Sequence, residues 1–229
     1  GGVGKTSIIE HLLYKGKVTT RVCKVDDDTS FCNYLDDEKK RKTTINSKVL
    51  HFPYNDKAIF VMDTPGYADF FGDTLSAIRA ADCVVIVVDA IAGLQVGSRK
   101  AWKEAQRLQK ARAFFINRLD KSQADFQKTV QSIKELYGKN CVVINVPIGA
   151  ESQLKGVVGV AHNTGIENAD DAAKALADKY HTELIDSVAE TDDALLEKYL
   201  NGEEEAIEIL ASLLEKSIFP QKFRRRRPH

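Results

Sequence analysis

A glycine-rich turn at the start of the chain, GGVGKT over residues 1–6, is the feature that most constrains the fold. It matches the end of the phosphate-binding pattern GxxxxGK followed by Ser or Thr, whose first glycine would fall before residue 1. Glycines let backbone N–H groups surround phosphate oxygens, and the following helix adds the positive end of its dipole. A plain glycine turn that opens a helix is the alternative. The residues expected to contact the phosphates are Gly1, Gly2, Val3, Gly4, Lys5, Thr6 and Ser7.

A second polar motif, Asp63-Thr64-Pro65-Gly66, comes directly after a predicted strand. An acidic residue at a strand end near a phosphate loop can hold a water bound to Mg²⁺. The N–H of Gly66 can meet a terminal phosphate, and a glycine can move when that phosphate leaves. Alone, the motif also fits a simple turn. Beside the phosphate loop, it predicts a Mg²⁺ site with the Thr6 hydroxyl as a ligand and Asp63 acting through water.

A third motif, Asn117-Arg118-Leu119-Asp120, follows the predicted strand 111–116. The carboxylate of Asp120 can accept two hydrogen bonds from the N1–H and the amino group of guanine, a pair that adenine does not offer. The side chain of Arg118 can cover the face of the purine. The alternative is a polar loop at a strand end. Together the three motifs predict a site for GTP and GDP, with Asn117, Arg118 and Asp120 at the base.

Apolar runs alternate with segments of helical period, which predicts an α/β fold with a mostly parallel sheet and helices on both faces. The strand that should precede the phosphate loop is not in the chain, so we expect the central first strand of the sheet to be missing. The expected strands are 48–52, 57–62, 83–89, 111–116 and 141–146, and the expected helices are 5–14, 69–81, 96–109 and 122–137.

The pattern changes after Pro147. Residues 157–162 could form one short strand, whereas 168–217 shows helical stripes only, the first made by Ala173, Leu176, Ala177, Tyr180, Leu184 and Val188. We therefore expect a nucleotide-binding domain over 1–146, a mainly helical inserted subdomain over 147–217 and an aberrant basic tail over 218–229. Residues 20–43 are rich in charges and are expected to be mobile unless a ligand orders them.

Charge and cysteine content exclude several classes of protein. The chain has 33 basic and 33 acidic residues, and five of the basic ones lie in the last nine residues, so residues 1–220 are net acidic. This balance gives no reason to expect direct DNA binding. Four cysteines without metal-ligand spacing predict reduced thiols. The longest apolar run, 83–88, is too short to span a membrane.

The order of the three motifs is that of GTPases, and longer stretches resemble elongation factor G. DTPGYADF (63–70) and NRLDKSQADF (117–126) are similar to the family's segments around its second and third motifs. VPIGAESQLKGVV (146–158) and ETDDALLEKYLNGEE (190–204) resemble parts of the insert that small GTPases and elongation factor Tu lack. The resemblance covers nearly all of residues 1–220.

This resemblance implies a P-loop GTPase fold and a monomeric cytoplasmic translation factor that binds GTP or GDP with Mg²⁺. It would hydrolyse GTP on the ribosome, which it would engage through domains outside this chain. An organelle-targeting peptide before residue 1 is an open alternative. RKTTI (41–45) resembles the family's switch segment, so Thr44, or otherwise Thr43, takes the place of the threonine that contacts Mg²⁺. Lys5 and Gly66 are the expected catalytic groups on the phosphates.

Three departures from the family pattern leave other interpretations open. Tyr67 stands where the family has the histidine that positions the attacking water, the insert is shorter, and an arginine-rich tail replaces the loop behind the guanine. A tyrosine cannot act as a base near neutral pH. The alternatives are therefore a weakly hydrolysing GTP-dependent binding switch and a ribosomal protection protein, although Tyr67 counts against the second. The 229-residue chain by itself is expected to be inactive.

Overall fold

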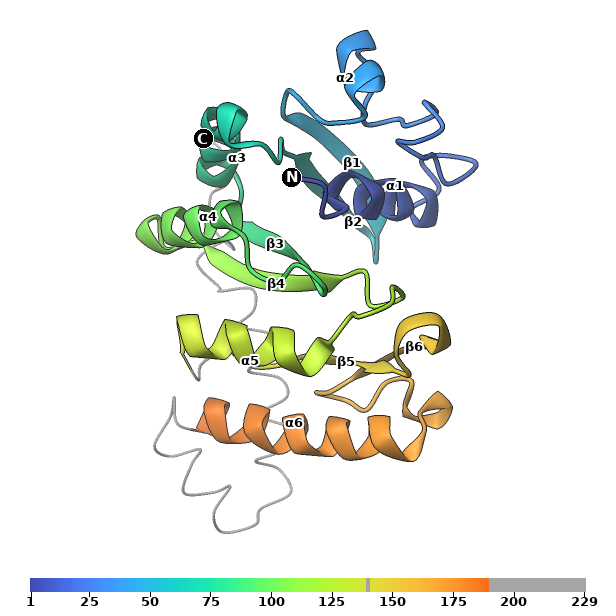
Figure 1. Ribbon diagram of the computed structural model, residues 1–229, viewed down its shortest axis with the longest axis vertical. Coiled ribbons are helices and arrows are strands. Elements are labelled where there is room, and N and C mark those ends of the chain that lie inside the picture. Colours follow the sequence, from blue (N-terminus) through green and yellow to red (C-terminus); the bar gives the residue numbers. More distant parts are fainter. Residues whose placement is uncertain (139–140, 190–229) are drawn as a thin grey trace. The chain divides into compact units, whose positions relative to one another are not determined.

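The computed structural model describes residues 1–138 and 141–189 (Figure 1). It divides the chain into two compact units, one formed by Gly1–Asn117 and one that begins at Arg118. The first unit contains α1 (Lys5–Lys15), α2 (Asp36–Arg41), β1 (Lys48–Tyr54), β2 (Lys57–Asp63), the 3₁₀ helix η1 (Ala68–Phe70), α3 (Phe71–Ala80), β3 (Cys83–Asp89), α4 (Val96–Arg107) and β4 (Ala111–Asn117). The second contains α5 (Phe126–Tyr137), β5 (Asn145–Ile148), η2 (Glu151–Gln153), β6 (Gly156–Gly159), η3 (Ile166–Asn168) and α6 (Asp171–Ala189).

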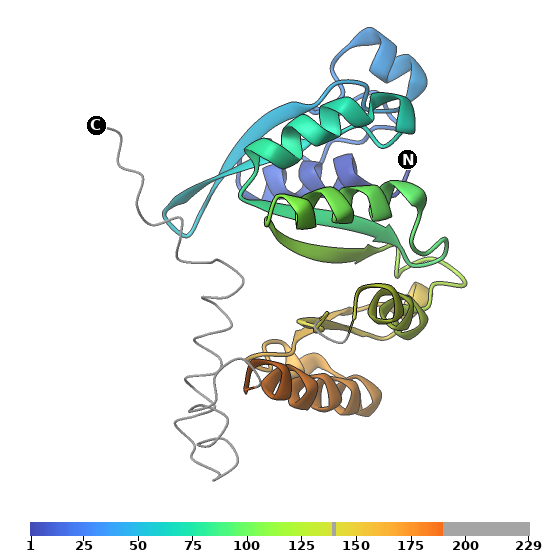
Figure 2. The same cartoon turned by 90° about the vertical axis from the view of Figure 1, so that its left-hand side faces the viewer.

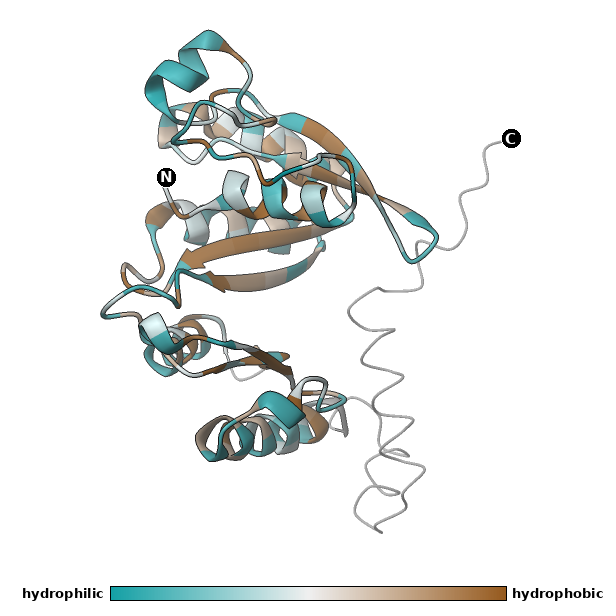
Figure 3. Ribbon diagram, turned by 90° about the vertical axis from the view of Figure 1, so that its right-hand side faces the viewer, coloured by the Kyte–Doolittle hydropathy of each residue, from teal (hydrophilic) through white to brown (hydrophobic). Residues whose placement is uncertain are grey.

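Strands β1 and β2 form an antiparallel hairpin that packs on α1. Its turn residues Asn55 and Asp56 have φ angles of 46° and 58°, a conformation that Asn and Asp tolerate better than most residues. The hydrophilic tip and the apolar strands are visible in Figure 3. Side chains from both elements and one from the segment before α2 share a small core, made by Ile9, Leu13, Cys32, Leu50, Phe52, Ile59 and Val61. This core fixes the helix that follows the glycine turn against the strand that ends at Asp63.

Strands β3 and β4 pair in parallel and end side by side, with Asp89 opposite Asn117. Helix α4 packs on both strands and against α3 (Figure 2). The ring of Trp102 stacks on that of Phe114, with 4.8 Å between centroids. The β3–β4 pair therefore holds Asn117 at a fixed strand end.

The described part of the second unit is built around the β5–β6 hairpin and the helices α5 and α6. Helix α5 begins at Phe126, later than the predicted residue 122, because the Asp125 side chain caps it by accepting a hydrogen bond from the Lys128 N–H at 2.9 Å. Helix α6 packs on the hairpin. Its predicted apolar stripe is confirmed in part by the burial of Ala173, Ala177, Tyr180 and Leu184. A second expected stripe at Leu195, Leu196 and Tyr199 lies outside the described residues.

The α/β class predicted from the sequence is confirmed, but the sheet differs from the prediction. The described strands form three two-stranded sheets, and only β3–β4 is parallel. None of the described strands pairs with both β2 and β3, which a continuous sheet would require. The expected strand 141–146 is shifted to β5, which pairs antiparallel with β6. The boundaries of the three expected domains stay predictions; the structure places its own division after Asn117.

Residues 20–43 have more tertiary contacts than their charged composition suggested. They contain the short helix α2, and four of their side chains are buried: Ser30, Cys32, Asn33 and Glu38. None of the described helices is both long enough and apolar enough to cross a membrane.

Candidate functional site

The glycine turn has the backbone geometry that the phosphate-loop prediction requires. Gly2 and Gly4 adopt φ angles of 71° and 90°, in the left-handed region that favours glycine. Helix α1 begins at Lys5, and no side chain caps its first turn. Val3 is buried, and its carbonyl oxygen accepts a hydrogen bond from Asn117 Nδ2 at 2.8 Å. The third motif is thus tied to the first through Asn117.

The second motif lies against the same turn. A Cβ atom on Gly66 would lie 2.7 Å from Lys5 Nζ and 2.8 Å from Gly1 Cα, so only glycine permits this approach. Burial lowers the pKa of Lys5, and the nearby Asp63 partly opposes this effect. Burial thus disfavours the charged form of Lys5, and an anionic phosphate bound at the glycine turn would offset this cost.

Tyr67 lies beside the first residue of the turn. A Cβ atom on Gly1 would be 3.3 Å from the Tyr67 ring, and the side chain is 53% exposed. The ring covers one side of the glycine turn, and its hydroxyl can donate or accept a hydrogen bond. This position permits a role near a terminal phosphate; the role itself stays a prediction.

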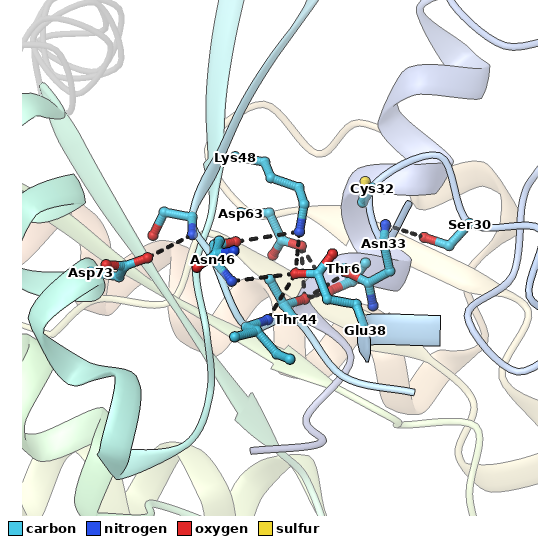
Figure 4. A network of polar contacts seen from close by, with 12 residues as sticks. Thr6, Ser30, Cys32, Asn33, Glu38, Thr44, Asn46, Lys48, Asp63 and Asp73 are labelled. Atoms are coloured by element: carbon cyan, nitrogen blue, oxygen red, sulfur yellow. Dashed lines mark hydrogen bonds and ion pairs between the residues drawn. The ribbon is translucent and has the colours of Figure 1, made fainter. Parts of the chain in front are cut away.

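Three oxygen-bearing side chains meet where α1, β2 and the segment before β1 come together (Figure 4). Thr6 Oγ1 lies 2.9 Å from Thr44 Oγ1 and donates to Asp63 Oδ2 at 2.8 Å. Thr44 Oγ1 also lies 3.3 Å from Asp63 Oδ2 and 3.0 Å from Asn33 Oδ1. These four contacts share only two hydroxyl protons. The cluster therefore has more oxygen lone pairs than protons, which suits a cation.

The burial of Asp63 supports the same conclusion. Its side chain is 1% exposed, and Oδ1 is buried without a hydrogen-bond partner among the described residues. Burial raises the pKa of Asp63, while the hydrogen bond from Thr6 and the charge of Lys5 oppose the rise. A divalent cation with its bound waters would satisfy this carboxylate. Hydroxyl and carboxylate oxygens are ligands that Mg²⁺ accepts, so the predicted set of Thr6, Thr44 and Asp63 fits the ion.

A buried ion pair fixes the segment that carries Thr44. Glu38 Oε1 accepts hydrogen bonds from the N–H groups of Ile45, at 2.9 Å, and Asn46, at 3.3 Å, and it pairs with the ammonium of Lys48. Sequence reasoning missed this pair because Glu38 lies in a charged run that predicts a solvated surface. The repeated charges of residues 36–42 gave no signal that one of them is buried.

We expect acid to loosen this segment selectively. Burial would raise the pKa of Glu38, but hydrogen bonds from Lys48, Ile45 and Asn46 outweigh it and hold the pKa below its ordinary value. The stabilisation by Glu38 is therefore present above the ordinary glutamate pKa, and it is lost as the pH falls through the lowered value. Amide exchange at Ile45 and Asn46, corrected for its intrinsic pH dependence, should accelerate in that window. Glu38→Gln should remove this pH dependence; if it persists, another group controls the segment.

Arg118 and Asp120 belong to the second unit. Arg118 has a φ angle of 64°, and the exposed Asp120 carboxylate lies 3.3 Å from Lys121 Nζ. Their roles in binding a base, and that of the exposed Ser7 at the phosphates, stay predictions.

Comparison with known proteins agrees with this geometry. Residues 2–218 match the protein family described as "Elongation factor Tu GTP binding domain". The structure also resembles a crystal structure of a protein from Thermus thermophilus, with a TM-score of 0.81 and 31% sequence identity. The match covers 91% of this chain and 33% of that protein, so the chain spans about a third of its relative's length. The predicted P-loop GTPase fold is confirmed. The chain belongs to the elongation factor Tu GTP-binding-domain family of translational GTPases.

Proposed function

We propose that the chain is the GTP-binding and GTP-hydrolysing domain of a translation factor that resembles elongation factor G and acts on the ribosome. The observation that carries the proposal is the cluster of Thr6, Thr44 and Asp63 oxygens beside the glycine turn. Such a cluster at a phosphate loop suits a nucleotide held with Mg²⁺. The insert-like segments 146–158 and 190–204 favour elongation factor G over elongation factor Tu.

Each residue of the site has a proposed role. Lys5 and the backbone of Gly1, Gly2, Val3 and Gly4, with Ser7 at the helix start, bind the phosphates. Thr6 and Thr44 hold Mg²⁺ directly, and Asp63 holds one of its waters. The ion would neutralise negative charge that develops on the phosphate oxygens. Gly66 offers its N–H to the terminal phosphate, and Asn117, Arg118 and Asp120 bind guanine. Contact with the ribosome is proposed for parts of the protein outside this chain. The protein would act as a monomer, in the cytoplasm or in an organelle that contains ribosomes.

Tyr67 favours a second candidate, a GTP-dependent switch that hydrolyses slowly. The phenol lies beside Gly1 and is half exposed, so it can orient a water, but it cannot accept a proton near neutral pH as a histidine can. In this candidate, GTP binding orders the segment that carries Thr44 and the ordered segment binds a partner. Slow turnover with tight GTP binding would favour the switch.

Titration of GTP and ATP with the full-length protein, in Mg²⁺ and in EDTA, tests the proposed binding. GTP should bind far more tightly than ATP, and EDTA should weaken GTP binding. Equal binding of both nucleotides would exclude guanine recognition. Binding that is indifferent to EDTA would exclude the role of the Thr6, Thr44 and Asp63 cluster.

Gly4→Ala is expected to weaken GTP binding by about 1–2 kcal/mol, roughly the cost of a left-handed conformation for a residue with a side chain. Gly4 has a φ angle of 90°, and a Cβ atom there would lie 2.4 Å from Asn117 Nδ2. The substitution would therefore disturb the bond from Asn117 to Val3. Gly97→Ala is the matched control, because a Cβ atom at Gly97 meets nothing within 4 Å. Equal GTP affinities of the two variants would show that the turn tolerates a side chain.

A further inference from the structure

A buried glutamate on α1 begins a chain of hydrogen bonds that ends at the proposed Mg²⁺ ligand Thr44. Glu10 is 0% exposed. Its Oε1 atom accepts hydrogen bonds from Ser30 Oγ at 2.6 Å and from the Cys32 N–H at 2.9 Å. Burying a carboxylate is costly unless it is well bonded. Both donors bind Oε1, while Oε2 is buried without a hydrogen-bond partner among the described residues. The two bonds tie residues 30–32 to α1.

The chain of bonds continues through Ser30 and Asn33 (Figure 4). Ser30 Oγ donates to Glu10 and accepts from the Asn33 N–H at 2.9 Å, so this hydroxyl acts as donor and acceptor at once. Asn33 is 2% exposed, and its Oδ1 atom lies 3.0 Å from Thr44 Oγ1. Residues separated by 34 positions in the sequence are thus linked by consecutive short contacts.

The amide oxygen of Asn33 can decide how the Thr44 hydroxyl is oriented. A hydroxyl has one proton, and Asn33 Oδ1 is an acceptor only. When Thr44 donates to Asn33, its lone pairs are free to face Thr6 and Asp63, as binding a cation requires. When that acceptor is absent, the proton can turn toward Asp63 Oδ2, which is 3.3 Å away, and repel a cation.

We propose that Asn33 is a positioning residue that orients the Thr44 hydroxyl toward Mg²⁺, and that Glu10 and Ser30 hold Asn33 in place. The inference rests on the proposed function, because it assumes that Thr44 binds Mg²⁺ when GTP is bound. It assigns roles to Glu10, Ser30 and Asn33, which lie outside the three nucleotide motifs.

A Mg²⁺ titration of the full-length protein with a fluorescent GTP analogue tests the inference. Asn33→Ala should raise the Mg²⁺ concentration needed for half-maximal binding about five- to tenfold, the value of one buried hydrogen bond. Excess Mg²⁺ should restore binding, and the affinity for GDP should stay within about twofold. Glu10→Ala should act in the same direction. Glu10→Gln should largely retain binding, because its amide oxygen can still accept from Ser30 and Cys32.

Thr29→Ala is the matched control, because the exposed Thr29 hydroxyl bonds to Lys24 within its own turn. An Asn33→Ala variant that titrates like Thr29→Ala would overturn the proposal. Equal weakening of GTP and GDP would also overturn it, since that result indicates a merely structural role. Amide exchange at Cys32 and Asn33 in nucleotide-free protein separates this failure from failure of the proposed function. Ser30→Ala should accelerate this exchange and Thr29→Ala should not, whether or not the protein binds GTP. Unchanged exchange in Ser30→Ala would show that the chain of hydrogen bonds does not hold this segment.

Discussion

Replacing Asp120 by asparagine is expected to weaken GTP binding by about 2–4 kcal/mol, a factor of roughly 30 to 1,000. Two charge-assisted hydrogen bonds from guanine to the carboxylate would become one acceptable bond and one clash between donors. The exposure of Asp120 supports this role, because its carboxylate is open to a ligand and its ion-pair partner Lys121 is exposed as well. A surface pair of this kind contributes little to stability, so the protein should remain folded.

Xanthine nucleotides provide the decisive comparison for this variant. Xanthine carries an oxygen where guanine carries an amino group, so the side-chain amide introduced by Asp120→Asn can donate to it. Preference should therefore move from GTP toward the xanthine nucleotide. Asp56→Asn, a change of the same type at the exposed hairpin turn, should leave both affinities unchanged. Undiminished GTP binding in the Asp120 variant would remove this residue from the site.

Tyr67→His is expected to accelerate GTP hydrolysis on the ribosome by about tenfold or more, with little change in GTP affinity. Positioned acid–base groups contribute about 10²- to 10⁴-fold to catalysis, and a phenol supplies only part of that effect near neutral pH. The Tyr67 ring already lies beside Gly1, so a histidine would start from the same place on the backbone. The unaltered protein should accordingly turn over slowly.

Single-turnover hydrolysis with saturating ribosomes measures this effect without interference from product release. Tyr54→His is a suitable control, because Tyr54 lies on the β1–β2 hairpin and is 63% exposed, similar to Tyr67. The control should leave the rate unchanged. If Tyr67→His is no faster than the unaltered protein, position 67 does not control the chemical step.

The sequence predicted the local features of the fold well. Five elements appear within a few residues of their predicted bounds: α1, the β1–β2 hairpin, β3, α4 and β4. Each depends on the local spacing of apolar residues or on a turn signal such as Asn55-Asp56. The three motifs were recognisable for the same reason. Thr6, Thr44 and Asp63 were predicted as a set, and the structure brings them together.

Features that depend on tertiary contacts could not be predicted. A single sequence cannot show that Glu38 is buried against Lys48, since a run of charges normally faces solvent. Glu10 offered a weak signal: it lies next to Ile9 and three residues before Leu13, on a buried side of α1, where a charge needs a partner. The pairing of strands in three separate sheets was equally inaccessible, because an apolar run predicts a strand but does not identify its neighbour.

Single-turnover hydrolysis of GTP by the full-length protein, with and without ribosomes, tests most directly whether this chain is the GTPase domain of a ribosome-dependent factor. We predict measurable Mg²⁺-dependent hydrolysis that ribosomes accelerate, no comparable hydrolysis of ATP, and loss of the reaction in Lys5→Ala. A rate that ribosomes leave unchanged, in protein that binds GTP tightly, would contradict the proposal.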